Sequence, residues 1–143
     1  MNRLFLALLM FALLVPLGHT LKEGGDSEAA LERKLASISG VAGTNCGLIK
    51  LMPDPTLAWA CAKAHEASKK PFWLALQMRS TDSEIWQAIA QNNDGNRYVI
   101  FYTSNNFGQP EFLPHFDVHE CFKPFSFNPT GFFLFECGEI SRD

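Results

Sequence analysis

The stretch from Pro71 to Asn106 constrains the fold most, because it alternates apolar and polar residues around a strong turn signal. Asp94-Gly95 favours the positive backbone angles of a tight hairpin turn. Residues 98–102 after it are aromatic or β-branched and favour a strand. Before it, apolar side chains recur at every second position, as on one face of a strand: Phe72, Leu74, Leu76 and Met78. We therefore predict the middle of an antiparallel sheet, with one strand over residues 72–79.

Residues 84–91 are compatible with two structures. As a helix, Thr81 and Glu84 would form a capping box, and Ile85, Ala88 and Ile89 would share one face. As a strand, the segment would lead directly into the hairpin signal at residues 92–96. We predict the strand, because the turn chemistry is strong and a strand-forming run follows it.

Two amphipathic segments predict helices. The first runs from residue 26 or 27 to about residue 39 and stops at Gly40. Its apolar residues lie on one stripe: Leu31, Leu35 and Ile38. The second spans residues 54–70, with Asp54 as its N-cap and Pro55 in its first turn. Small residues on one of its faces would allow close approach to a sheet.

Three further segments complete the predicted architecture. Residues 47–51 form a short strand or an extended connector. Residues 111–122 form a fourth strand whose apolar residues lie at even positions: Phe112, Phe116, Val118 and Phe122. Residues 132–137 form a fifth strand, after a connection over residues 123–130. The predicted fold class is α+β, with one or two helices packed on a four- to five-stranded antiparallel sheet that is stapled by disulfides.

The first twenty residues have the order of parts found in a secretory signal peptide. Arg3 gives a short positive start, and an apolar region follows from Leu4 to Leu17. An uncleaved membrane anchor is the alternative, but the apolar region is shorter than the ~20 residues of a spanning helix. We predict a signal peptide over residues 1–20, a single exported α+β domain over residues 21–143, and no membrane span after cleavage. A periplasmic or secreted location in a bacterial envelope is expected.

The chain has four cysteines, Cys46, Cys61, Cys121 and Cys137. An even set in a small exported domain predicts two disulfides. Pairing Cys46 with Cys61 and Cys121 with Cys137 closes two short loops, each worth on the order of 3 kcal/mol in the loop-entropy model. The nested pairing, Cys61 with Cys121 and Cys46 with Cys137, stays open as an alternative.

A series of short motifs resembles a group of small exported bacterial proteins of uncharacterised function. A helix that carries a Cys comes first, and the following motifs are Pro71-Phe72-Trp73, Asp82-Ser83 before Trp86, Asp94-Gly95 and Tyr102-Thr103-Ser104. That group has Asp at the position of Thr103. The resemblance implies export and a single α+β domain, and it implies no activity.

Residues 115–121 contain the sharpest candidate for chemistry. On a strand, His115, Asp117 and His119 would share one face and offer ligands to a metal ion. The two His would lie roughly 13 Å apart, too far for both to bind one ion. Asp117 with one His could bind a metal if another element supplied ligands. The alternative is a solvated polar face.

Four aromatic residues of the central stretch are candidates for a binding surface: Trp73, Trp86, Tyr98 and Tyr102. If exposed, such side chains would favour contact with another protein, because aromatic residues dominate interface hot spots. The alternative is a second buried face of the sheet, under the first helix.

Composition excludes some classes of partner. The formal net charge is −3, and a nucleic-acid-binding chain needs basic patches. We predict no nucleic-acid partner and no cofactor. The leading hypothesis is a non-enzymatic exported or periplasmic protein that binds another exported protein or an envelope component. The alternative is a metal-dependent hydrolase that uses His115, Asp117 and His119.

Overall fold

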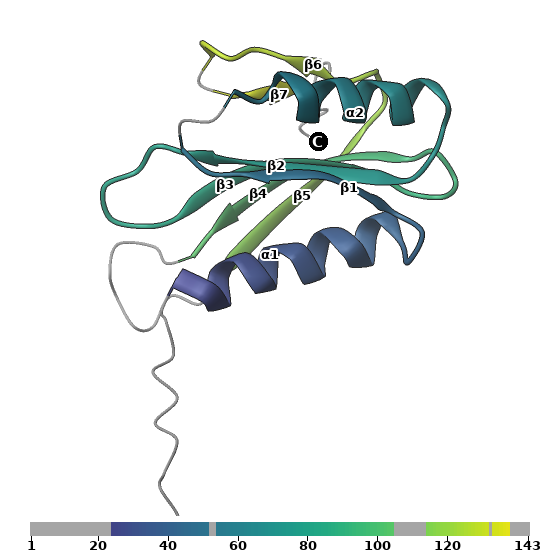
Figure 1. The fold of residues 1–143 in the computed structure, drawn as a ribbon. Helices are drawn as coiled ribbons and strands as arrows, with labels where there is room; N and C mark the ends of the chain where they lie inside the picture. Colours follow the sequence, from purple (N-terminus) through teal and green to yellow (C-terminus); the bar gives the residue numbers. More distant parts are fainter. Residues whose placement is uncertain (1–23, 52–53, 105–113, 132, 138–143) are drawn as a thin grey trace, which may run out of the picture.

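A five-stranded sheet lies between two helices, α1 (Gly24–Ser39) on one face and α2 (Thr56–Ala67) on the other (Figure 1). The computed structural model describes residues 24–51, 54–104, 114–131 and 133–137. The predicted signal peptide over residues 1–20 lies outside these residues. The α+β fold class is confirmed, with both predicted helices packed on the sheet.

The sheet follows the order of its strands in the chain, β1-β2-β3-β4-β5. The bounds of its strands are β1 Thr44–Ile49, β2 Phe72–Met78, β3 Ile85–Gln91, β4 Arg97–Thr103 and β5 His115–Cys121. A second sheet contains two short strands, β6 Ser126–Phe127 and β7 Phe135–Glu136. This small hairpin lies on the same side of the large sheet as α2 (Figure 1).

The hairpin of β3 and β4 confirms the predicted strand over residues 84–91. The two strands pair antiparallel from Ile85–Thr103 to Gln91–Arg97. The Asn92 side chain accepts hydrogen bonds from the backbone N–H groups of Asp94 and Asn96, at 3.0 and 2.9 Å. Gly95 has φ 82°, a conformation that costs glycine little. The turn chemistry therefore prevails over the local helix signal.

Both faces of the central strands are buried. Toward α1, the core contains the helix residues Leu31 and Leu35 and the strand residues Trp73, Trp86 and Tyr102. Toward α2, Ala58 and Ala62 pack on the alternating residues of β2: Phe72, Leu74 and Leu76. The alternation places two apolar sets on opposite faces, and a helix covers each set.

Two features differ from the predicted meander. β1 pairs parallel to β2, because α2 connects them and a helical crossover returns the chain in the same direction. Residues 133–137 of the predicted fifth strand do not add a strand to the large sheet, and residue 132 lies outside the described residues. Instead β7 pairs with β6, which lies in the segment predicted as a connection. Residues 111–113 of the predicted fourth strand lie outside the described residues.

The C-terminal end of α2 comes three residues before the predicted end at Lys70. The N–H of Lys70 donates to the carbonyl of His65 at 2.9 Å, and the N–H of Lys69 donates to the carbonyl of Glu66 at 3.1 Å. Lys69 has φ 53°, which is the left-handed position of this end motif. At the other end, α2 begins at Thr56 with Pro55 as its N-cap residue, one position after the predicted N-cap Asp54. The Asp54 side chain still accepts a hydrogen bond from the Thr56 N–H at 3.0 Å.

Gln87 attaches the small hairpin to the centre of the large sheet. It lies on β3 and is fully buried. Its Oε1 accepts from the N–H groups of Leu134 and Phe135 at 2.6 and 3.1 Å, and its Nε2 donates to the Phe135 carbonyl at 2.9 Å. A two-stranded hairpin is marginally stable alone. These three hydrogen bonds therefore help to hold it in place.

Replacing Gln87 by Ala should destabilise the protein more than replacing Gln91, the other buried glutamine of β3. Gln87→Ala leaves three backbone groups unpaired, and we expect a loss of about 3 kcal/mol in the free energy of unfolding. Gln91 makes a single hydrogen bond, to the Lys70 carbonyl at 3.0 Å, so Gln91→Ala should cost about 1–2 kcal/mol. Urea denaturation measures both values, and equal losses would contradict the attachment role of Gln87.

Candidate functional site

A groove of about 390 Å³ opens at one end of the sheet, between the ends of β1 and β2, the start of α2 and the β6–β7 hairpin. Its lining residues come from all four elements and the segments next to them. The apolar ones are Ile49, Leu51, Pro55, Leu76, Met78, Phe127, Pro129 and Leu134, and the others are Lys50, Gln77, Arg79 and Gly131.

The groove combines an apolar floor with basic side chains. Lys50 and Arg79 line it, and no acidic residue does. Lys50 Nζ also lies 2.5 Å from the Glu28 carboxylate of α1. That hydrogen bond and the charge of Glu28 raise the pKa of Lys50, so its ammonium group stays protonated.

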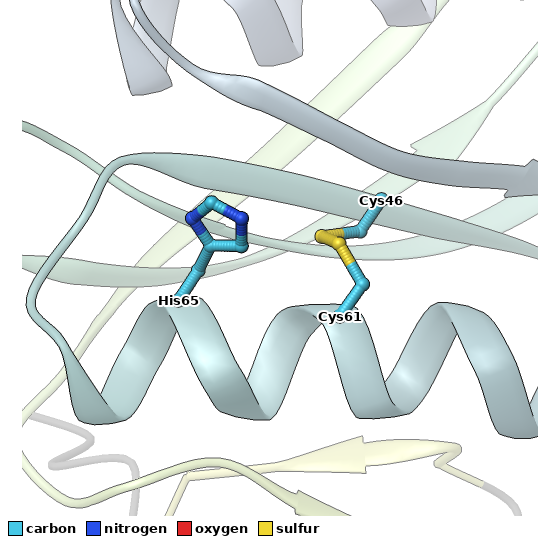
Figure 2. Close-up of side chains that lie close together, drawn as sticks. All are labelled: Cys46, Cys61 and His65. Carbon is cyan, nitrogen blue, oxygen red and sulfur yellow. A yellow bond between two sulfur atoms is a disulfide. The ribbon is translucent and has the colours of Figure 1, made fainter.

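The first disulfide fixes α2 to the edge of the sheet. It joins Cys46 of β1 to Cys61 in the middle of α2, with a Cα–Cα distance of 5.6 Å (Figure 2). The second joins Cys121, the last residue of β5, to Cys137 directly after β7. This is the local pairing that the spacing favoured. Each bond holds one element that borders the groove against the sheet.

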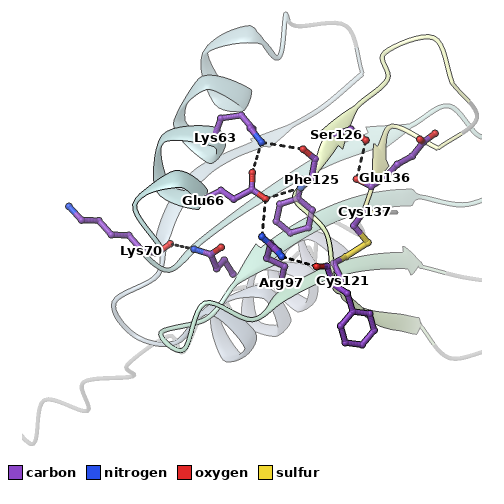
Figure 3. Close-up of polar contacts among 11 residues, drawn as sticks. Lys63, Glu66, Lys70, Arg97, Cys121, Phe125, Ser126, Glu136 and Cys137 are labelled. Carbon is purple, nitrogen blue, oxygen red and sulfur yellow. Dashed lines mark hydrogen bonds and ion pairs between the residues drawn. A yellow bond between two sulfur atoms is a disulfide. The ribbon is translucent and has the colours of Figure 1, made fainter. Parts of the chain in front are cut away.

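Glu66 of α2 holds the segment that enters the hairpin. Its carboxylate is buried, lies 2.5 Å from Lys63 Nζ and accepts a hydrogen bond from the Phe125 N–H at 2.8 Å (Figure 3). Lys63 also donates to the Phe125 carbonyl at 3.2 Å. Arg97 of β4 approaches the same carboxylate at 3.8 Å and donates to the Phe122 carbonyl at 3.2 Å. A single buried charge thus orders the connection between β5 and β6.

The predicted metal residues lie on β5, and the structure brings two of them together. His119 Nε2 lies 2.9 Å from Asp117 Oδ2. Within the described part of the chain, His115 does not join them in a group of three possible ligands. The one such group consists of Cys46, Cys61 and His65, and its two sulfur atoms are bonded to each other (Figure 2). The geometry therefore favours a surface contact between a carboxylate and an imidazole on β5.

The predicted aromatic binding surface is wrong. Trp73, Trp86 and Tyr102 are buried under α1, and Tyr98 is half-buried beside them. The central strands have a set of apolar side chains on each face of the sheet. The apolar stripe of α1 covers the set that contains these residues. Burial is the main cause that raises the pKa of Tyr102, which keeps its hydroxyl neutral. These residues belong to the core.

The groove was not found from the sequence. Its lining comes from segments that are far apart in the chain and carry no shared motif. For the hairpin side of the groove, the sequence predicted only a connection over residues 123–130, which contains Pro124 and Pro129. It did not predict where this connection lies in the fold. Gln87 and Glu66 hold the β6–β7 hairpin and the segment that leads into it. The sequence pattern around Gln87 predicts only a strand, and the pattern around Glu66 predicts only a helix.

Comparisons of the chain with protein-family models, with curated proteins and with solved structures found no match. The resemblance to small exported bacterial proteins therefore stays a prediction. Within the described residues, neither helix has the length and apolar character needed to cross a membrane.

Removing the charge of Glu66 should weaken the attachment of the segment that leads into the β6–β7 hairpin. Glu66→Gln keeps the shape of the side chain but loses the ion pair with Lys63, and we expect a loss of about 2 kcal/mol in the free energy of unfolding. The amide of Phe125 should also exchange its hydrogen faster. Glu32→Gln is the control, because Glu32 is exposed on α1 and its change should cost less than about 0.5 kcal/mol. An unchanged Phe125 exchange rate would refute this role.

Proposed function

We propose that this protein is a non-enzymatic exported domain that binds another exported protein through the groove. The bound segment presents an apolar side chain to the floor and an adjacent carboxylate to Lys50 and Arg79. The observation that carries the proposal is the combination of an apolar floor with two basic side chains and no acidic one in the lining.

The size and rigidity of the groove support this function. Pockets for small ligands and anchoring side chains begin near roughly 300 Å³, and the groove lies in that range. Its walls are held by a disulfide on α2, by Gln87 on the hairpin and by Glu66 on the entering segment. A wall that is already ordered loses little conformational entropy when a partner binds.

The chemistry of the groove favours a protein segment as its occupant. The two cations suit one or two carboxylates, whereas a polyanion needs a larger basic surface. The proposed export is supported by the signal-like first twenty residues and by two disulfides, which persist in oxidising compartments.

A single substitution in the groove should weaken the binding of an apolar anion. The fluorescent probe 1-anilinonaphthalene-8-sulfonate has both features of the proposed occupant. We expect the oxidised protein to bind it, and Leu51→Glu to weaken the binding roughly tenfold, because a carboxylate then enters the floor. Leu57→Glu is the matched control outside the lining and should change the affinity less than about twofold.

The basic side chains are tested in the same assay. Arg79→Gln should weaken probe binding, while Lys70→Gln, an exposed change elsewhere, should not. Cross-linking then identifies the natural occupant: a benzoylphenylalanine at Met78 should capture one exported protein in the producing cell, and one at Leu57 should capture less. Equal effects of the groove and control variants on the probe would refute the groove as a binding site.

A further inference from the structure

The outer edge of β5 has no strand beside it among the described residues. β5 pairs with β4 over seven residues without interruption, from His115 opposite Thr103 to Cys121 opposite Arg97. Its sequence, HFDVHEC, contains neither Pro nor Lys, the residues that commonly protect an edge. Val118 in its middle is 37% exposed, and Phe122 directly after it is 75% exposed.

The other edge of the sheet is less suited to pairing. β1 has an irregularity between Asn45 and Gly47, where its register with β2 shifts. Such a bulge interrupts the row of backbone groups that another strand would need. A disulfide also holds β1 to α2 through Cys46. A new strand would therefore join at β5.

The sequence of β5 is complementary to itself when two copies run antiparallel about Val118. In that register Val118 lies opposite Val118 of the second copy, and Asp117 lies opposite His119 on each side of the two-fold axis. A carboxylate can accept a hydrogen bond from an imidazole N–H in the directly facing position, and such polar pairs stabilise two neighbouring strands. Within one chain the same two side chains already lie 2.9 Å apart, so the four groups would form one cluster.

A pair of opposite charges matches on the face toward α1. Phe116 contacts Tyr102 on that face, and Lys34 of α1 lies 6.0 Å from the centre of the Phe116 ring. The same register places Glu120 of the second copy opposite Phe116. Glu120 is exposed, and in this register it would meet Lys34 of the first copy, because Lys34 lies over Phe116. The two-fold axis would repeat this contact.

We infer that two copies of this protein associate through β5, in antiparallel register about Val118. The two sheets become one continuous sheet of ten strands. A two-fold contact uses the same edge of both copies, so the assembly closes as a dimer. The surface lies on the opposite edge of the sheet from β1, so it is separate from the groove lining on β1 and β2.

Analytical ultracentrifugation of the oxidised protein tests the dimer. Between about 1 and 200 µM, the mass should rise from that of one chain toward that of two. Val118→Lys places two like charges on the axis and should weaken association by at least roughly tenfold. Val41→Lys is the matched control, because Val41 is fully exposed at the end of α1 and away from β5.

A charge exchange tests the register itself. Lys34→Glu and Glu120→Lys each place like charges in contact within a dimer of identical copies, so each variant alone should stay monomeric. An equimolar mixture restores both contacts and should form the mixed dimer. This test does not depend on Val118→Lys folding correctly.

Three results would overturn the inference. They are a single-chain mass for the wild type over the whole concentration range, equal association of Val118→Lys and the wild type, and a mixture that associates no better than its two components. None of these results bears on the groove, because the probe assay uses other residues.

Discussion

The burial of both faces of β2 and β3 is the constraint on which the rest of the structure depends. Strand residues alternate, so covering Phe72, Leu74 and Leu76 with α2 leaves Trp73 and its neighbours to be covered by α1. α2 alone does not cover its whole face, and the β6–β7 hairpin covers the remainder. A hairpin with two-residue strands cannot hold itself in place. Gln87, Glu66 and the bond from Cys121 to Cys137 hold it there.

The groove follows from the way in which α2 and the β6–β7 hairpin together cover one face of the sheet. It forms where the start of α2 and the loop of the hairpin meet the ends of β1 and β2. The apolar core therefore reaches the surface at this place, next to Lys50 and Arg79. The buried polar residues Gln87 and Glu66 lie outside the groove lining. Gln87 is satisfied by backbone partners, and Glu66 by the Phe125 N–H, Lys63 and Arg97, so both have a structural role.

The two edge strands, β1 and β5, differ in how well they are protected against pairing with another strand. The difference comes from the path of the chain before and after each strand. β1 is followed by α2, which is bonded to it through Cys61, and its irregular register limits further pairing. β5 follows the β3–β4 hairpin and ends at Cys121, where the chain leaves the sheet for the hairpin. Its side chains alternate between a mostly polar set toward α2 and a mixed set toward α1. That alternation makes a register with opposite charges possible when two copies meet.

The sequence by itself determined the central strands, the hairpin at Asp94-Gly95 and both helices, because each depends on local periodicity or turn chemistry. Tertiary structure alone decided which apolar set each helix covers, so the buried positions of Trp73, Trp86 and Tyr102 could not be separated from an exposed patch beforehand. It also decided the parallel pairing of β1 and the return of β6 and β7 over the sheet. These features rest on contacts such as Gln87 with Phe135, between residues 48 positions apart, which leave no local pattern in the chain.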